Sequence, residues 1–149
     1  MVQTEMTLIT KIVPAKLEQL KQVLAGIKEP GSPDLIALIG TVHFARWVII
    51  DNGKRLLFDS NFDGSVDQYL TDFATQPDLR QALDAVWGCC EGYPAGGAGG
   101  DSVKFKQWVH KNMTAAEVFY SAYPDATAKD VKKALAIRAK FTDLLSEFS

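Results

Sequence analysis

The chain has 149 residues, of which 47% are hydrophobic and 23% charged, and its formal net charge is −2. These values predict one globular α+β domain, residues 1–149, with a core that needs no disulfides. They exclude a general electrostatic attraction to nucleic acid, and no stretch is long and apolar enough to span a membrane. Because the first residues do not resemble a secretory signal, we expect a cytoplasmic protein in which the adjacent Cys89 and Cys90 remain reduced.

The first part of the chain predicts a strand followed by a helix. Apolar residues alternate over residues 5–13, as in a half-buried strand. Pro14 then begins a helix, because a proline is tolerated at the first helical position. Apolar residues recur at helical spacing up to Ile27, after which glycine and proline end the helix.

Residues 41–62 predict a β-hairpin, which is the clearest local pattern in the sequence. Two runs rich in β-branched and aromatic residues, 41–50 and 55–62, flank the dipeptide Asn52-Gly53. This dipeptide is typical of a two-residue type I′ turn, because both of its residues adopt positive φ readily. Such a turn fixes the register and places Arg46 opposite Asp59.

The same register gives the hairpin two unequal faces. One face is nearly all apolar and is expected to meet helices; it carries His43, Ala45, Trp47, Ile49, Leu56, Phe58, Ser60 and Phe62. The other face mixes large apolar with polar side chains; it carries Phe44, Arg46, Val48, Ile50, Arg55, Leu57, Asp59 and Asn61. A loop longer by one residue would reverse this assignment.

The second half of the chain predicts mainly helices and one further strand. In order, it indicates a helix capped by Ser65, a helix from Pro77 to Gly88, a mobile glycine-rich loop over 92–100, a short helix or irregular packed segment over 103–109, a strand over 116–123 and a long terminal helix from Thr127. The element order predicts a ferredoxin-like βαββαβ antiparallel sheet, with extra helices before the last strand and a C-terminal helix. Helices would cover only one face of that sheet.

The mixed face of the hairpin has two interpretations. Arg46 and Asp59 can form an ordinary cross-strand ion pair on a half-buried surface, which is the commoner case. Alternatively, a partner subunit covers the large apolar side chains and leaves a pocket for a small apolar molecule. In that pocket Phe44, Arg46, Asp59 and Asn61 would bind the ligand, and the 92–100 loop would gate it.

This element order and mixed sheet face resemble the dimeric α/β-barrel superfamily, whose members pair two such sheets face to face. The superfamily includes antibiotic-biosynthesis monooxygenases, stress-responsive barrel proteins, chlorite dismutases and dye-decolourising peroxidases. The run Phe62-Asp63-Gly64-Ser65 is similar to the Asp-Gly element of the peroxidases, although Ser60 and Asn61 precede it where that motif begins with glycine. The resemblance covers most of residues 5–148, rests on architecture, and implies a homodimer with a ligand cavity between the sheets.

Haem is the cofactor that the resemblance raises. In haem-binding relatives the proximal histidine lies on a helix, which matches His110 better than His43. For both residues a structural role is the commoner case. No clustered Cys, His or carboxylate spacing predicts a metal site, and Cys89 and Cys90 follow a helix C-terminus, where a thiolate is disfavoured.

The sequence therefore supports two hypotheses about function. In the first, the chain is a dimeric α/β-barrel protein that binds a small apolar ligand on the open sheet face, with a haem-dependent oxidoreductase as one form of it. In the second, it is a non-catalytic oligomerisation module without a small-molecule site. No motif identifies a reaction.

Overall fold

The computed structural model describes residues 2–148, within which the chain forms a four-stranded antiparallel sheet and five α-helices. The strands are β1 (Gln3–Lys11), β2 (Val42–Ile50), β3 (Arg55–Asp63) and β4 (Met113–Thr114). The helices are α1 (Leu17–Ile27), α2 (Val66–Thr75), α3 (Pro77–Trp87), α4 (Ser102–Asn112) and α5 (Ala128–Ser146). The sheet order β2-β3-β1-β4 is compatible with a ferredoxin-like α+β fold. Over residues 2–148, no helix combines the length and apolar character that a membrane crossing requires.

The β2–β3 hairpin has the predicted register, although its turn differs from the prediction. Arg46 lies opposite Asp59, as the sequence indicates. The last paired residues are Ile50 and Arg55, so the loop has four residues instead of two. Three successive loop residues have positive φ: Asp51, Asn52 and Gly53. The residue pair next to the expected two-residue turn does not form. The loop therefore gains one residue on each side, and the register of the strands is unchanged.

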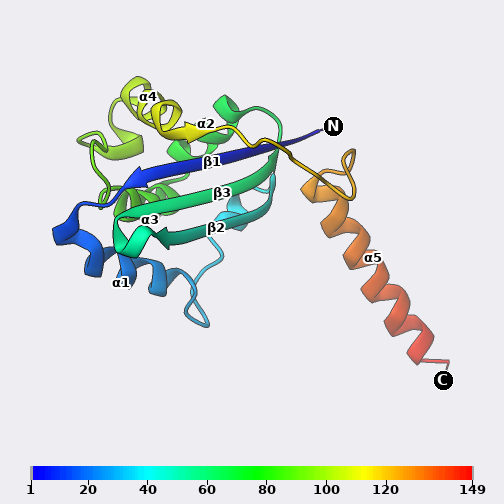
Figure 1. Cartoon of the computed structure of the whole chain (residues 1–149). Coiled ribbons are helices and arrows are strands. Elements are labelled where there is room, and N and C mark those ends of the chain that lie inside the picture. Colours follow the sequence, from blue (N-terminus) through cyan, green and yellow to red (C-terminus); the bar gives the residue numbers. More distant parts are fainter. Residues whose placement is uncertain (1, 149) are drawn as a thin grey trace.

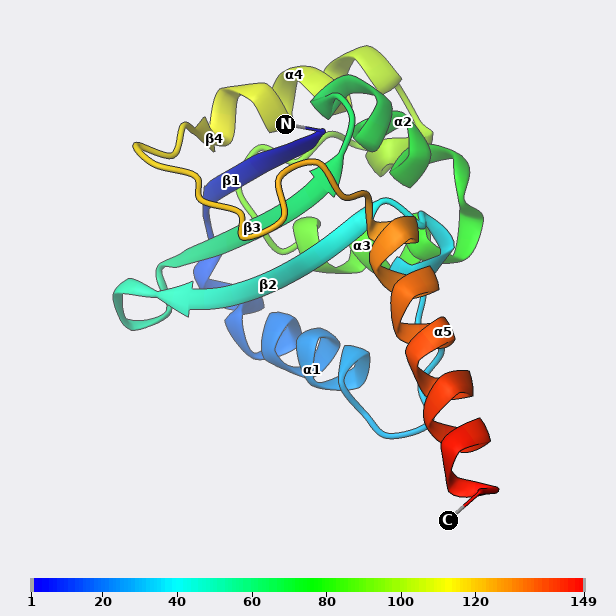
Figure 2. The same ribbon diagram turned by 90° about the vertical axis from the view of Figure 1, so that its right-hand side faces the viewer.

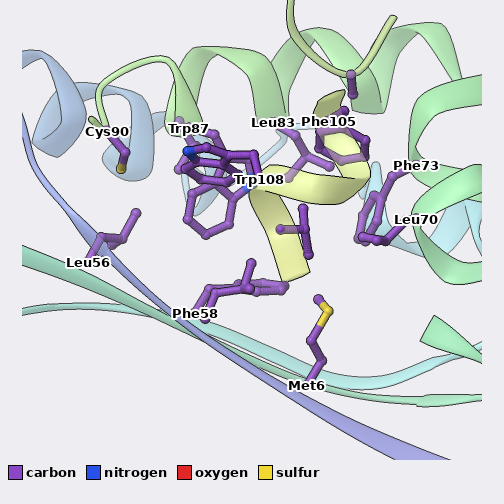
Figure 3. Close-up of a cluster of buried hydrophobic side chains, with 14 of the residues drawn as sticks. Met6, Leu56, Phe58, Leu70, Phe73, Leu83, Trp87, Cys90, Phe105 and Trp108 are labelled. Carbon is purple, nitrogen blue, oxygen red and sulfur yellow. The ribbon is translucent and has the colours of Figure 1, made fainter. Parts of the chain in front are cut away.

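Alternation along the strands gives the sheet a covered face and an open face. The covered face is almost inaccessible to solvent; its side chains on the central strands include Met6, Leu8, Leu56, Phe58 and Phe62, none more than 2% exposed. Helices α1 to α4 lie over this face, while α5 projects away from the rest of the molecule (Figure 1). Figure 3 shows Phe58 and Met6 extending from the sheet toward the side chains of the helices.

Aromatic contacts connect the covered face to the helices. Phe58 meets the edge of Trp87 at 5.5 Å between ring centroids, and Trp87 meets Trp108 at 5.8 Å. Phe62 stacks on Tyr69 at 3.8 Å. Such pairs add to the free energy gained from burial alone.

Side chains at the predicted positions cap two of the helices. The hydroxyl of Ser65 accepts a hydrogen bond from the backbone N–H of Gln68, which confirms the predicted start of α2. Thr127 and Asp130 form the reciprocal capping box of α5. The segment over residues 103–109, for which the sequence leaves a helix or an irregular segment open, lies within α4.

The glycine-rich segment 92–100 packs against α3 and does not form the loose loop that its composition predicts. Gly97 and Ala98 are buried. The backbone N–H of Ala98 and the hydroxyl of Tyr93 both donate to Asp84 of α3, at 2.9 and 2.6 Å. A Cβ at Gly97 would clash with the Asp84 carboxylate, which explains the glycine. Most of this segment belongs to the helix layer, and only Gly92 at its start lies beside residues of the open face, in a pocket that includes Ile9 and Arg55.

The strand predicted over residues 116–123 is not formed. The strand on the outer side of β1 is instead the two-residue β4, directly after α4. Beyond it, the backbone N–H of Ala116 donates to the side-chain carboxylate of Glu5 rather than to a backbone carbonyl of β1. The alternating apolar residues that suggested a strand are largely exposed, with Val118 at 83% and Tyr120 at 81%. Alternation here does not reflect a buried sheet face.

Candidate functional site

The open sheet face is the surface of the three long strands that the helices leave uncovered. It consists of twelve side chains: Glu5, Thr7, Ile9 and Lys11 of β1, Phe44, Arg46, Val48 and Ile50 of β2, and Arg55, Leu57, Asp59 and Asn61 of β3. Each of them is half-buried or exposed, whereas their neighbours along β1 and β3 are mostly buried. The open sheet face contains all four residues that the sequence predicts to bind a ligand.

A polar row crosses the middle of the open sheet face. A guanidinium nitrogen of Arg46 donates to Asp59 at 2.6 Å, and the hydroxyl of Thr7 lies 3.4 Å from the second carboxylate oxygen. The Arg46 side chain is 71% exposed, whereas that of Asp59 is 19% exposed. The strands therefore hold the carboxylate, and the guanidinium retains N–H donors that face solvent.

An apolar row lies beside the polar one. Val48 of β2, Leu57 of β3 and Ile9 of β1 are side by side in the sheet. On the other side of the polar row Phe44, which is 65% exposed, lies opposite Asn61. Large apolar side chains next to a charged pair are typical of a surface that meets another molecule.

The sequence predicts the residues that β2 and β3 place on this face, but not those that β1 places there. Thr7 and Ile9 complete the polar and the apolar row. A signal was present for Thr7, because it and its odd-numbered neighbours Glu5 and Lys11 are more polar than Met6 and Leu8 between them. The sequence did not show which strand would lie beside β1, and so these residues could not be assigned to the site.

The placement of His43 on the helix-covered face is wrong. Val42 pairs with Phe62 and Phe44 with Asn61, which makes His43 the extra residue of a β-bulge. The bulge redirects the ring, whose Nε2 lies 2.7 Å from Asp63. The His43 side chain is only 4% exposed and serves this contact at the end of the sheet.

The two histidines do not fit a haem. The Nε2 of His43 is engaged by Asp63 in a closed environment. His110 is exposed on α4, and its neighbours Trp108 and Lys111, rather than His110 itself, line a pocket between α4 and the strands β1 and β3. An axial ligand needs a free ring nitrogen that faces a cavity. Within residues 2–148, no group of three or more His, Cys, Asp and Glu side chains is arranged to hold a metal ion.

One end of the open sheet face is covered by the segment that joins β4 to α5. Figure 2 shows this segment crossing in front of the sheet, while α3 lies behind it. The side-chain amide of Gln3 donates to the carbonyls of Tyr123 and Ala126 at 3.0 and 2.9 Å. The Tyr123 ring lies 6.1 Å from that of His43. The covered end leaves the polar and apolar rows accessible.

A separate apolar pocket of about 390 Å³ lies between α1 and α3, on the covered side of the sheet. Trp47 of β2 forms part of its wall, together with residues such as Val23, Ile27, Leu79 and Ala82. The indole N–H of Trp47 is buried and finds no acceptor among the described residues. This pocket has the size and lining of a small-molecule site, which the sequence did not indicate.

Both cysteines are free and buried. Burial raises the pKa of Cys90 to about 11, against the opposing effect of the Thr10 hydroxyl that donates to its sulfur. Burial also raises the pKa of Cys89, although Lys16 opposes the shift. Thiols with raised pKa values are weak nucleophiles at neutral pH, so the geometry assigns them to packing.

No protein-family model matches the chain, and a search of the curated proteins finds no match. The strongest features of the candidate site are an open sheet face with adjacent polar and apolar rows, and an apolar pocket beneath the same sheet.

Proposed function

We propose that this protein is a homodimer of ferredoxin-like subunits that pair through the open sheet face and bind a small apolar molecule between the two sheets. The observation that carries the proposal is the surface of the face itself. Phe44 and Val48, exposed by 65% and 42%, flank the Arg46–Asp59 ion pair on rigid strands. A second copy is a partner that would cover this apolar surface by symmetry.

Two sheets that pack face to face are about 10 Å apart, so side chains from both sheets would line the space in which the molecule binds. The row of Ile9, Leu57 and Val48 would supply apolar contacts to the bound molecule. Arg46 would orient it, because Asp59 holds the guanidinium while other N–H groups remain free to donate. These groups support binding, and no group on the face is arranged as a nucleophile with a base.

The test combines oligomeric state with binding of the apolar fluorophore anilinonaphthalene sulfonate. Leu57→Lys places a charge in the apolar row and should remove the association through the open sheet face, which light scattering detects as a lower oligomer mass. Val103→Lys is the matched control, because Val103 is 61% exposed on α4. Arg46→Ala should leave the dimer intact and weaken dye binding about tenfold. If dye binding survives Arg46→Ala unchanged, the proposed ligand site is wrong.

A further variant separates the open sheet face from the pocket between α1 and α3. Ala82→Phe fills that pocket, because Ala82 is part of its lining. It should leave dye binding unchanged if the ligand lies between the sheets. A loss of binding in this variant alone would place the ligand beneath the sheet and contradict the proposal.

A second candidate is a non-catalytic oligomerisation module, which the exposed apolar residues of α5 favour. Phe141 on the projecting helix is 60% exposed, and Phe148 just beyond its end is 82% exposed. In that case the wild-type chain should self-associate, and neither Arg46→Ala nor Ala82→Phe should change the weak binding of the dye.

A further inference from the structure

Helix α5 is fixed at its base and exposed along the rest of its length. The backbone N–H of Ala128, itself 3% exposed, donates to Asp63 of β3 at 2.8 Å. In contrast, every residue from Lys132 to Phe148 is exposed. The helix therefore leaves the body of the protein in a set direction (Figures 1 and 2).

The exposed helix carries a regular apolar seam. Within α5 it consists of Ala134, Ile137, Phe141 and Leu144, at spacings of three, four and three residues, and Phe148, two residues past the end of the helix, continues the same spacing. Ile137, Phe141, Leu144 and Phe148 are 58, 60, 49 and 82% exposed. A 3.5-residue repeat is the pattern with which one helix packs along another, because it keeps the seam facing the partner.

The charges beside the seam indicate which helix this partner is. Lys133, Lys140 and Glu147 follow one edge of the seam at seven-residue intervals, and Arg138 lies on the other edge. In a parallel pair, opposite edges of the two helices meet, which brings Lys133 against Arg138. In an antiparallel pair of identical helices, like edges meet, which brings Glu147 of one copy beside Lys140 of the other.

We infer that α5 pairs with α5 of a second copy of this chain as an antiparallel two-helix coiled coil. In the register that aligns both seams, Phe141 lies opposite Leu144, and Ile137 opposite Phe148. The two-fold symmetry repeats each of these contacts and the contact between Lys140 and Glu147. The pair also places the two bodies at opposite ends, where α5 leaves each of them.

A membrane surface is the other kind of partner that an amphipathic helix can have. Anionic lipid favours cations next to the most apolar part of the helix. Here the most apolar part, residues 141–148, carries the acidic Asp143 and Glu147 and no cation. The charge distribution therefore favours a second copy over a lipid surface.

This inference does not rest on the proposed function, because the seam lies on α5 and the proposed ligand site on the strands. The two can fail separately. If Leu57→Lys alone abolishes all self-association, the helix pair is wrong and the sheet interface stands. If Phe141→Glu abolishes it and Leu57→Lys has no effect, the sheet interface is wrong and the helix pair stands.

The first experiment measures self-association of the full chain by sedimentation equilibrium. Phe141→Glu, introduced into the Leu57→Lys variant, should weaken the remaining association about tenfold or more. Ala139→Glu is the matched control, because it adds the same charge to the outer side of the same helix. Equal dissociation constants for the two variants would overturn the inference.

The second experiment tests the antiparallel arrangement by exchange of charges. Glu147→Lys should weaken association about fivefold, since it replaces two attractive contacts with repulsive ones. The double variant Lys140→Glu with Glu147→Lys exchanges the charges and should restore association to within about twofold of the unaltered helix. A double variant as weak as the single one would overturn the arrangement.

The third experiment measures distances between spin labels on the two copies. Labels at Lys132→Cys should be separated by about 30 Å along the axis, and labels at Ser146→Cys by about 10 Å. Equal short distances at both sites would show a parallel pair and contradict the inference.

A last experiment measures binding to vesicles of phosphatidylserine and phosphatidylcholine. If the chain binds these vesicles, Phe141→Glu abolishes that binding, and the chain does not self-associate, then α5 is a membrane-binding helix and the inference is overturned.

Discussion

The same three strands present two surfaces with different physical roles. On the covered face, Leu56, Phe58 and Phe62 of β3 are at most 2% exposed and contact the helices. The alternating residues of the same strand, Leu57, Asp59 and Asn61, lie half-buried on the open sheet face. The covered face therefore contributes most of the burial that stabilises the subunit, whereas the open face remains accessible to a partner.

The largest expected contrast is between one phenylalanine on each face. Phe58→Ala should lower the free energy of unfolding by about 3–5 kcal/mol, because the ring is 2% exposed and packs on Trp47 and Trp87. Phe44→Ala should change it by about 0.5 kcal/mol or less in the monomer, because Phe44 is 65% exposed. Urea unfolding at low protein concentration measures both values.

Protein concentration sharpens this comparison. If a second copy covers the open sheet face, the effect of Phe44→Ala should grow as the concentration rises, while that of Phe58→Ala should not. Similar losses for both variants at low concentration would show that the open face contributes to the core, and the distinction between the faces would fail.

A smaller effect on the free energy of unfolding is expected from the buried pair of hydroxyls between the sheet and α2. The Ser60 and Tyr69 hydroxyls lie 2.7 Å apart in the core, and burial raises the pKa of Tyr69 above its ordinary value. Tyr69→Phe should lower the free energy of unfolding by about 1–2 kcal/mol, because it leaves the Ser60 hydroxyl without a partner. The double variant with Ser60→Ala should cost less than the sum of the two single variants, as a double-mutant cycle measures. Additive losses would show that the pair is not coupled.

The sequence predicted those parts of the fold that local patterns determine. The hairpin register followed from the Asn52-Gly53 turn, and the start of α2 followed from the Ser65 cap. The segments that failed depend on tertiary packing. Residues 92–100 have the composition of a loose loop, yet Gly97 is explained by its close approach to Asp84 and Gly99 by its close approach to Arg80. Residues 116–123 alternate like a strand, yet the chain turns away from the sheet after Thr114.

The candidate site was predictable only within the hairpin. Arg46 and Asp59 lie close in sequence and share a turn, so their pairing could be derived. Thr7 and Ile9 reach the same surface through a strand pairing about fifty residues away, which no local pattern encodes. The bulge at His43 also depends on tertiary contacts, because it places the ring beside Asp63 and near Tyr123.

The anchor of α5 should give an effect of intermediate size. Asp63 bonds both His43 and the first N–H of α5, with distances of 2.7 and 2.8 Å. Asp63→Asn should lower the free energy of unfolding by about 1 kcal/mol and accelerate hydrogen exchange at the Ala128 amide, because it removes a charged acceptor at the helix N-terminus. Asp67→Asn is the control, since the Asp67 side chain is 71% exposed, pairs with Lys106 and lies away from α5. Unchanged exchange at Ala128 would contradict the anchoring role.

The ion pair of the open sheet face should contribute less to stability than its short distance suggests. The Arg46 side chain is 71% exposed, so water and salt screen its interaction with Asp59. Arg46→Ala should lower the free energy of unfolding by about 0.2–1 kcal/mol, and 1 M salt should remove most of this difference. A loss that exceeds this range and persists in salt would assign the pair to the subunit core and weaken its assignment to a ligand site.

The smallest effect is expected at the first turn of α5, where it depends on pH. The hydroxyl and the backbone N–H of Thr127 both donate to Asp130 and hold the pKa of this carboxyl below its ordinary value. Because the folded pKa is lowered, the stabilisation is complete above the ordinary pKa and is lost as the pH falls through the lowered value. Acid titration followed by NMR should therefore show the first turn of α5 loosening before the sheet does. Thr127→Ala should raise the pKa of Asp130 toward its ordinary value, and Asp130→Asn should abolish the acid transition. If the first turn and the strands instead lose their structure together in both variants, α5 is not a separately anchored helix, and its exposed seam would have to be explained as part of the body.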